Sequence, residues 1–224
     1  MNTESARFNM IEQQIRPWEV LDQAVLSLLA TVRREDFVPP AMRALAFVDT
    51  QVPLMAGEPD GPHMLEPKVE ARLLQELQVQ RHEKVLEIGT GSGFMAALLA
   101  HRAMFVHTLE CRPALVRMAR DSLRRNGISN VTVHEVGAEA GARGLPGEAP
   151  FDAIVLSGSV AEVPPALLAQ LKVGGRLVAV VGELPMMRAR LFTRVGDAAW
   201  SDTDLFDTVA PRLQGFEEHT RFHF

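Results

Sequence analysis

The sequence predicts an α/β fold with a mostly parallel, doubly wound sheet, a helical cap before the sheet and antiparallel strands after it. From residue 67 onward, short apolar segments alternate with longer segments of helical periodicity. A glycine-rich turn separates the first of these apolar segments from the helix that follows it. Alternation at this spacing is typical of parallel strands joined by helices that cover both faces of a sheet.

The cap, residues 1–66, is predicted to contain two helices and a long irregular stretch. The first helix is expected at residues 5–15, where apolar side chains recur at helical spacing, and Pro17 ends it. Asp22 is a suitable N-cap for the second helix. The apolar stripe of that helix consists of Val25, Leu26, Leu29 and Val32. Proline and glycine are frequent at residues 53–67, so we expect irregular chain there, with an exposed loop at residues 57–62.

The α/β core is expected at residues 67–184, within a single domain of residues 1–224. Its helices are predicted at residues 68–77, 94–100, 113–125 and 164–171, and its strands at residues 85–88, 104–109, 131–136, 153–156 and 177–181. Pro113 and Pro164 stand where the first turn of a helix tolerates proline. Weaker alternation over residues 185–224 predicts antiparallel strands that complete the sheet.

The composition is that of a globular protein from a reducing compartment. Apolar residues make up 47% of the 224 residues, yet no apolar run is long enough to span a bilayer. The N-terminus lacks the pattern of a secretory signal, and Cys111 is the only cysteine, so we expect a cytoplasmic location. The net charge is −5 and the arginines are scattered, which argues against nucleic acid as a partner. The seven histidines show no metal-ligand spacing.

The strongest motif is Glu87-Ile88-Gly89-Thr90-Gly91-Ser92-Gly93, which follows a predicted strand and opens a helix. Its glycines allow a sharp turn and let a ligand lie against the main chain. A second carboxylate, Glu110, ends the next predicted strand, 17 residues after Gly93 (110 − 93). Glu110 should therefore lie beside the same crevice and accept hydrogen bonds from both hydroxyls of a ribose.

Two nucleoside cofactors use turns of this kind. Nicotinamide dinucleotides favour G-x-G-x-x-G, and here the third glycine would fall on Phe94. The pattern acid-x-Gly-x-Gly-x-Gly instead resembles the first motif of Rossmann-like methyltransferases that use S-adenosylmethionine. Glu87 would repel the phosphates of a dinucleotide, whereas it would attract the amino group of a methionine moiety, directly or through water. We therefore expect S-adenosylmethionine as the cofactor.

Further segments resemble the protein-L-isoaspartate O-methyltransferase family. Arg34-Glu35-Asp36-Phe37-Val38-Pro39 and Ala46-Phe47-Val48-Asp49 are similar to two elements of that family, which usually has tyrosine at the position of Phe47. A longer resemblance runs from Phe151 to Gly182 and includes Gly174-Gly175-Arg176-Leu177. The resemblance implies an enzyme that methylates the α-carboxylate of isoaspartyl residues in damaged proteins and releases S-adenosylhomocysteine.

The motif and the resemblance together imply two groups of site residues. The cofactor side consists of Glu87, Gly89, Thr90, Gly91, Ser92, Gly93, Glu110, Cys111 and Glu139, the last as a candidate for contact with the adenine. The acceptor side consists of Asp49, His63 and Leu65. At Leu65 the family usually has a serine that helps to hold the reacting carboxylate. Leucine cannot donate a hydrogen bond, so His63 and Lys68 are the nearest candidates to replace that serine.

Three other functions stay open at this point. The methyl acceptor can be a different protein or a small metabolite, which Leu65 favours. The chain can instead sense S-adenosylmethionine or its demethylated product without chemistry. On fold alone, a nicotinamide-dependent oxidoreductase is a further alternative.

Overall fold

The N-terminal cap is helical, as predicted. The computed structural model describes residues 2–58 and 61–217, and residues 59 and 60 of the predicted loop lie outside this range. The cap contains α1 (Thr3–Met10), a π-helical turn (Ile11–Ile15), a 3₁₀ turn (Arg16–Trp18), α2 (Gln23–Thr31) and further 3₁₀ turns at Arg34–Asp36 and Pro40–Leu45. The Asp22 side chain caps α2 by accepting a hydrogen bond of 2.7 Å from the Ala24 N–H.

A short hairpin interrupts the stretch that was predicted to be irregular. Its strands are β1 (Val52–Pro53) and β2 (His63–Met64), and Val52 pairs with Met64. The prediction of irregular chain was wrong here, because Val52 and Met64 are buried and their pairing depends on the core beneath them.

The main sheet has seven strands in the order β5-β4-β3-β6-β7-β8-β9. The strands are β3 (Lys84–Ile88), β4 (Phe105–Glu110), β5 (Val131–Glu135), β6 (Phe151–Val160), β7 (Leu171–Glu183), β8 (Met186–Gly196) and β9 (Ala199–Thr208). The first five are parallel, and β8 and β9 are antiparallel, which confirms the prediction for the C-terminal strands. The order reverses between β3 and β6, and ligands bind at such a switch point in open α/β sheets.

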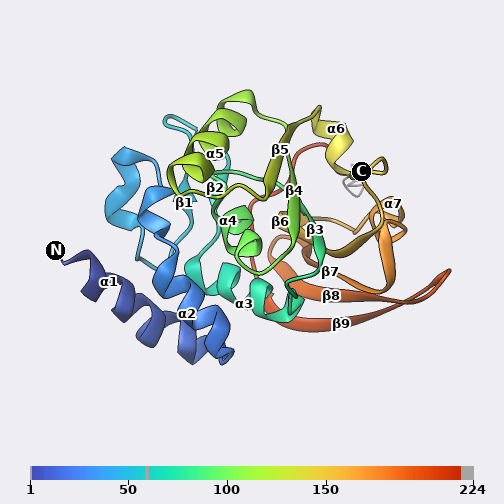
Figure 1. The fold of residues 1–224 in the computed structure, drawn as a ribbon, viewed down its shortest axis with the longest axis horizontal. Helices are drawn as coiled ribbons and strands as arrows, with labels where there is room; N and C mark the ends of the chain where they lie inside the picture. The colour runs from blue at the N-terminus through green and yellow to red at the C-terminus, as the bar shows by residue number, and fades with distance from the viewer. Residues whose placement is uncertain (1, 59–60, 218–224) are drawn as a thin grey trace, which may run out of the picture.

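Helices cover both faces of the sheet (Figure 1). They are α3 (Pro67–Leu77), α4 (Phe94–Ala100), α5 (Pro113–Arg125), α6 (Ala138–Gly141) and α7 (Pro165–Leu168). Alternate residues of the central strands enter two apolar cores, so Val85 packs with α3, α4 and α5, whereas Leu86 packs with α7. Burial of both faces explains why the apolar residues Val85, Leu86 and Ile88 of β3 do not alternate with exposed polar ones.

Two core elements differ in length from their predictions. The predicted helix at 164–171 ends at Leu168, because Leu171 enters β7 and pairs with Phe151 of β6. Both side chains are fully buried, so tertiary packing overrides the helical periodicity. For the same reason β6 extends beyond the predicted residues 153–156.

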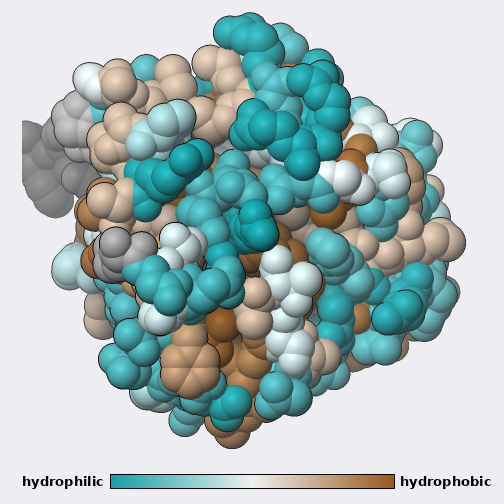
Figure 2. Space-filling view, turned by 60° about the vertical axis from the view of Figure 1, so that its left-hand side comes forward, coloured by the Kyte–Doolittle hydropathy of each residue, from teal (hydrophilic) through white to brown (hydrophobic). Residues whose placement is uncertain are grey.

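The surface of the protein displays both hydrophilic and hydrophobic side chains (Figure 2). Hydrophilic side chains cover most of the face in Figure 2, and hydrophobic ones show chiefly in a hollow below its centre. Within residues 2–58 and 61–217, no helix has the length and apolar character needed to cross a membrane.

Candidate active site

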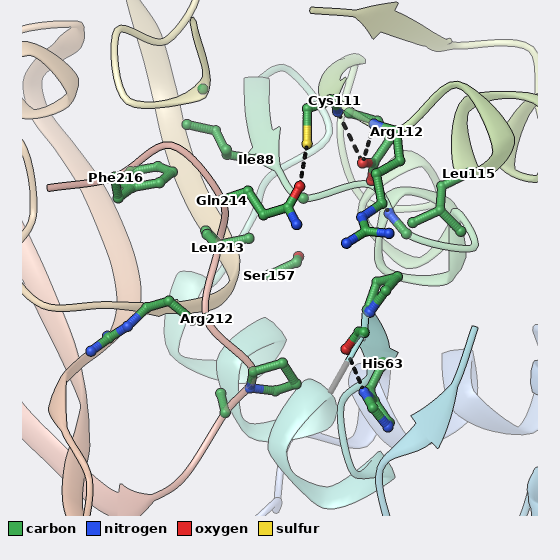
Figure 3. A pocket seen from close by; sticks show the side chains of 18 of the residues that line it. His63, Ile88, Cys111, Arg112, Leu115, Ser157, Arg212, Leu213, Gln214 and Phe216 are labelled. Atoms are coloured by element: carbon green, nitrogen blue, oxygen red, sulfur yellow. Dashed lines mark hydrogen bonds between the residues drawn. The ribbon is translucent and has the colours of Figure 1, made fainter. Parts of the chain in front are cut away.

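A cavity of about 800 Å³ lies at the carboxyl ends of β3, β4 and β6, where the strand order reverses. The glycine turn, the end of β4, the β1–β2 hairpin and the segment after β9 form its walls (Figure 3). A cavity of this size at a switch point is suited to a small organic ligand.

The glycine turn has the backbone that its sequence requires. Gly89, Gly91 and Gly93 have φ angles of 90°, 53° and 87°, which L side chains rarely adopt. Gly89 and Gly91 line the cavity. Gly93 faces α5 instead, where a Cβ would lie 3.3 Å from the Ala119 Cα. Gly89 and Gly91 thus leave room for a ligand, and Gly93 allows the close packing of α4 on α5.

The two hydroxyl residues between these glycines are buried beside the turn. Thr90 and Ser92 are 3% and 2% exposed, and neither lines the cavity. The Thr90 Oγ1 lies 2.6 Å from the Thr108 Oγ1 on β4. Both side chains therefore face the protein interior and not the cavity.

Glu110 at the end of β4 ties the glycine turn to the neighbouring strand. Its carboxylate accepts hydrogen bonds from the backbone N–H groups of Gly91 at 2.9 Å, Cys111 at 2.9 Å and Arg112 at 3.0 Å. Glu110 also lines the cavity. A carboxylate accepts about four hydrogen bonds, so one position stays available to a ligand hydroxyl while these three remain. Bonds to both hydroxyls of a ribose would require one backbone bond to open.

An apolar recess adjoins Glu110 on the side of β5. It is lined by Ile88, Leu109, Val136, Leu213 and Phe216 around Ala138 and Gly141 of α6. Glu139 also belongs to α6, but it does not line the cavity, and its exposed carboxylate lies 3.7 Å from the Arg143 guanidinium.

Cys111 does line the cavity, and its thiol donates to the Gln214 Oε1 at 3.5 Å. Burial raises the pKa of this thiol, so the cysteine stays uncharged at neutral pH.

Glu87 does not reach the cavity itself. It is fully buried, and its carboxylate accepts hydrogen bonds from the Thr108 and Ser157 hydroxyls, both at 2.7 Å. Burial raises the pKa of Glu87 to about 8, although both hydrogen bonds oppose this shift. Ser157, which follows the β6 residues that pair with β3, lines the cavity. Sequence reasoning missed Ser157, although its place directly after a strand predicted at 153–156 was an available signal.

The three acceptor-side residues occupy different places. His63 lines the cavity, and its Nδ1 lies 2.7 Å from the Gly61 carbonyl oxygen, so Nδ1 carries the proton and Nε2 is left for another partner. Asp49 lies outside the lining, in an ion pair of 2.7 Å with Lys68. Leu65 is 2% exposed and packs in the core. Of these residues and Lys68, only His63 meets the cavity.

Sequence reasoning also missed several lining residues. Arg112 forms an ion pair of 2.7 Å with Glu58, which ties the loop of the hairpin to the start of α5. The chain after β9 lines the cavity with Val209–Leu213, Gln214 and Phe216. Gly215 seats this segment on α6, because a Cβ there would collide with the backbone of Ala138. No motif marked the residues after β9, since the resemblance in sequence faded after residue 182.

The residues of the cavity fit S-adenosylmethionine. Glu110 has the carboxylate for a ribose, the recess beside it has apolar walls for an adenine, and Gly91 leaves the turn open to a ligand. Within the described ranges 2–58 and 61–217, no group of three or more potential metal ligands gathers.

Comparison with known proteins identifies the family. The model of the protein-L-isoaspartate(D-aspartate) O-methyltransferase family matches residues 5–209. A protein-L-isoaspartate O-methyltransferase of Rhodopseudomonas palustris is 39% identical over 209 residues, 93% of each chain. One of Methanoculleus marisnigri is 40% identical over 176 residues, 79% of this chain and 77% of its own.

Two solved structures share the fold. A Plasmodium falciparum protein described as a protein-L-isoaspartate O-methyltransferase, in complex with S-adenosyl-L-homocysteine, has a TM-score of 0.77 and 20% identity, and the match covers 96% of this chain and 99% of that one. Another protein-L-isoaspartate O-methyltransferase has a TM-score of 0.77 and 23% identity, with coverage of 91% and 64%. Together with the sequence match over residues 5–209, these findings show that the chain belongs to the protein-L-isoaspartate(D-aspartate) O-methyltransferase family.

Proposed function

We propose that this protein transfers a methyl group from S-adenosylmethionine to the α-carboxylate of L-isoaspartyl residues in damaged proteins. The observation that carries the proposal is the cavity at the switch point, where Glu110 and the glycine turn meet. The membership of the chain in the family supports the same acceptor.

The reaction needs little from the protein in acid–base chemistry. When bound, S-adenosylmethionine supplies a methyl group on a sulfonium, and a carboxylate oxygen forms the new C–O bond as the C–S bond breaks and leaves a thioether. The acceptor is already ionised at neutral pH, so no side chain has to remove a proton. The residues of the cavity must therefore align the two reactants and exclude water from the carboxylate.

The polarity of the cavity orients the cofactor. The recess of Ile88, Val136 and Phe216 suits an adenine, and Glu110 beside it suits the ribose. Gly89 and Gly91 would hold the methionine moiety, and His63 lines the same cavity for the acceptor.

Replacing Glu110 with alanine should weaken the binding of S-adenosylhomocysteine by about 1.5–3 kcal/mol, as expected for a hydrogen bond to a charged group. Titration calorimetry measures this loss. Glu135 pairs with Glu110 in the sheet but is exposed, so Glu135→Ala is the matched control and should bind normally. Equal affinity of the two variants would remove Glu110 from the cofactor site.

On the acceptor side, we propose that His63 takes the place of the serine that Leu65 replaces. Its Nδ1 donates to the Gly61 carbonyl oxygen, so Nε2 is the ring nitrogen left to contact the incoming carboxylate. His63→Ala should raise the KM for an isoaspartyl peptide roughly tenfold, the equivalent of about 1.4 kcal/mol, and leave cofactor affinity unchanged. The exposed residue His82 provides the control variant, His82→Ala. An unchanged KM in the His63 variant would show that another group holds the carboxylate.

The proposal as a whole is tested with labelled S-adenosylmethionine and a short isoaspartyl peptide, beside its normal aspartyl twin. Base-labile label in the isoaspartyl peptide alone is the expected result. The buried, apolar Leu65 favours a second candidate, a methyltransferase with a different acceptor. Protein that binds S-adenosylhomocysteine but labels neither peptide would support that candidate, and labelling of a cell lysate would then separate it from a binding protein without catalysis.

A further inference from the structure

A chain of four hydrogen-bonded side chains runs from the glycine turn to the cavity. Thr90 lies 2.6 Å from Thr108, whose hydroxyl donates to Glu87 at 2.7 Å, and Ser157 donates to the other oxygen of Glu87 at 2.7 Å. Of these four residues, only Ser157, the last in the series of hydrogen bonds, lines the cavity. The hydrogen-bonded path from the Glu87 carboxylate to the cavity therefore passes through the Ser157 hydroxyl.

We propose that Ser157 accepts a hydrogen bond from the amino group of the cofactor's methionine moiety, and that Glu87 positions Ser157 for this contact and releases a proton when the cofactor binds. The inference rests on the cofactor named in the proposed function and is independent of the methyl acceptor.

The position of Ser157 supports the first part of this inference. Ser157 follows the β6 residues that pair with β3, and a Cβ on Gly89 would lie 3.6 Å from the Ser157 carbonyl oxygen. In Figure 3, Ser157 lies near the middle of the cavity, beside Leu213 and away from Phe216. An ammonium group would be poorly solvated against Val136 and Phe216, whereas a hydroxyl oxygen beside a carboxylate stabilises it.

The protonation state of Glu87 decides what Ser157 offers to a ligand. An ionised carboxylate only accepts, so both Thr108 and Ser157 must donate to it, and the Ser157 oxygen then presents lone pairs to the cavity. A protonated Glu87 can donate to Ser157 instead, and the serine hydroxyl hydrogen then turns toward the cavity. An ammonium ligand pairs only with the first arrangement, so its binding selects the ionised form of Glu87.

The charges around Glu87 explain why a proton is held before the ligand arrives. The charged groups that act on it are carboxylates, Glu70 on α3 and Glu110 on β4, and Arg34 already pairs with Glu70. Burial and these anions raise the pKa of Glu87 to about 8, so the carboxyl group is mostly protonated at pH 7. A cation at Ser157 lowers this pKa, and the proton leaves.

Calorimetry with two ligands tests the contact. S-adenosylhomocysteine carries the amino group, whereas 5′-methylthioadenosine keeps the adenosine and the sulfur but lacks the amino acid part. Ser157→Ala should weaken S-adenosylhomocysteine about tenfold or more and change 5′-methylthioadenosine less than about twofold. An equal loss for both ligands, or no loss for either, would overturn the contact. Thermal unfolding of the variant checks that its fold is retained.

Calorimetry in two buffers of different ionisation enthalpy at pH 7 tests the proton. Wild-type protein should release close to one proton on binding S-adenosylhomocysteine, and Glu87→Gln should release none. No release from the wild type, or the same release from the variant, would overturn the role of Glu87. A wild type that binds both ligands but methylates no isoaspartyl peptide would contradict the proposed acceptor alone, whereas a wild type that binds neither ligand would overturn both proposals.

Discussion

Replacing Arg34 with methionine is expected to lower the free energy of unfolding by about 3–5 kcal/mol, because it leaves a buried charge without its partner. Arg34 is 1% exposed and forms an ion pair with Glu70, which is 5% exposed. The same guanidinium donates to the Leu65 carbonyl oxygen at 2.7 Å and lies 5.0 Å from the centre of the Phe94 ring. Urea unfolding measures the loss. Arg124, in an exposed pair with Asp121, is the control, and Arg124→Met should cost less than about 1 kcal/mol.

A second substitution separates the lost charge from lost packing. Arg34→Met combined with Glu70→Leu removes both charges and should recover much of the stability. The loss in the single variant should stay constant near pH 5–6 and grow as the pH rises through 7, where wild-type Glu70 loses its proton and Glu70 of the variant keeps it. Burial already raises the pKa of Glu70 to about 7, and without Arg34 that pKa rises further, so the folded state binds a proton that the unfolded state has lost. A loss that is independent of pH, or a double variant no more stable than the single one, would contradict this explanation.

Replacing Gly91 with valine should abolish detectable binding of S-adenosylhomocysteine, a loss of more than about 100-fold, or about 2.7 kcal/mol. Gly91 has a φ of 53° and lines the cavity, and a Cβ there would lie 3.1 Å from the Leu54 Cδ1. The two branches of valine would fill space that the ligand needs and would push the turn away from Glu110. Calorimetry or fluorescence titration measures binding, and circular dichroism shows whether the fold survives.

A control variant is needed to separate the loss of space for the ligand from the backbone strain that a side chain causes at a positive φ angle. Gly127 has a φ of 69° and open space around its Cα, and it lies outside the cavity. Gly127→Val therefore carries a comparable conformational cost and should bind the ligand normally. Retained binding in the Gly91 variant would show that the cofactor does not approach the turn.

The elements that could be predicted are those specified by residues close together in sequence. Asp22 caps α2, and Pro113 opens α5 as expected. The glycine turn could be predicted because seven consecutive residues, 87–93, determine its backbone conformation and form the motif that indicates a ligand. Glu110 was recognised because parallel strands bring their carboxyl ends to one edge of the sheet.

The parts that could not be predicted depend on contacts between distant segments. Leu65 was expected at the acceptor side, yet its side chain packs in the core, and its carbonyl is held by Arg34, 31 positions earlier. Glu87 was expected beside the ligand, but the strand turns its side chain into the protein, and Ser157, 70 positions later, reaches the cavity instead. Spacing along a chain contains no information about such pairings until the topology of the sheet is known.

The return of the chain after β9 has a consequence for synthesis in the cell. Residues 209–216 leave the outermost strand and come back to close the cavity, with Ser159 and Arg212 forming a parallel bridge. The glycine turn and Glu110 therefore emerge from the ribosome long before the wall that completes their pocket. A nascent chain that has released only residues 1–184 therefore lacks the wall that residues 209–216 form, and its cofactor site is still open on that side.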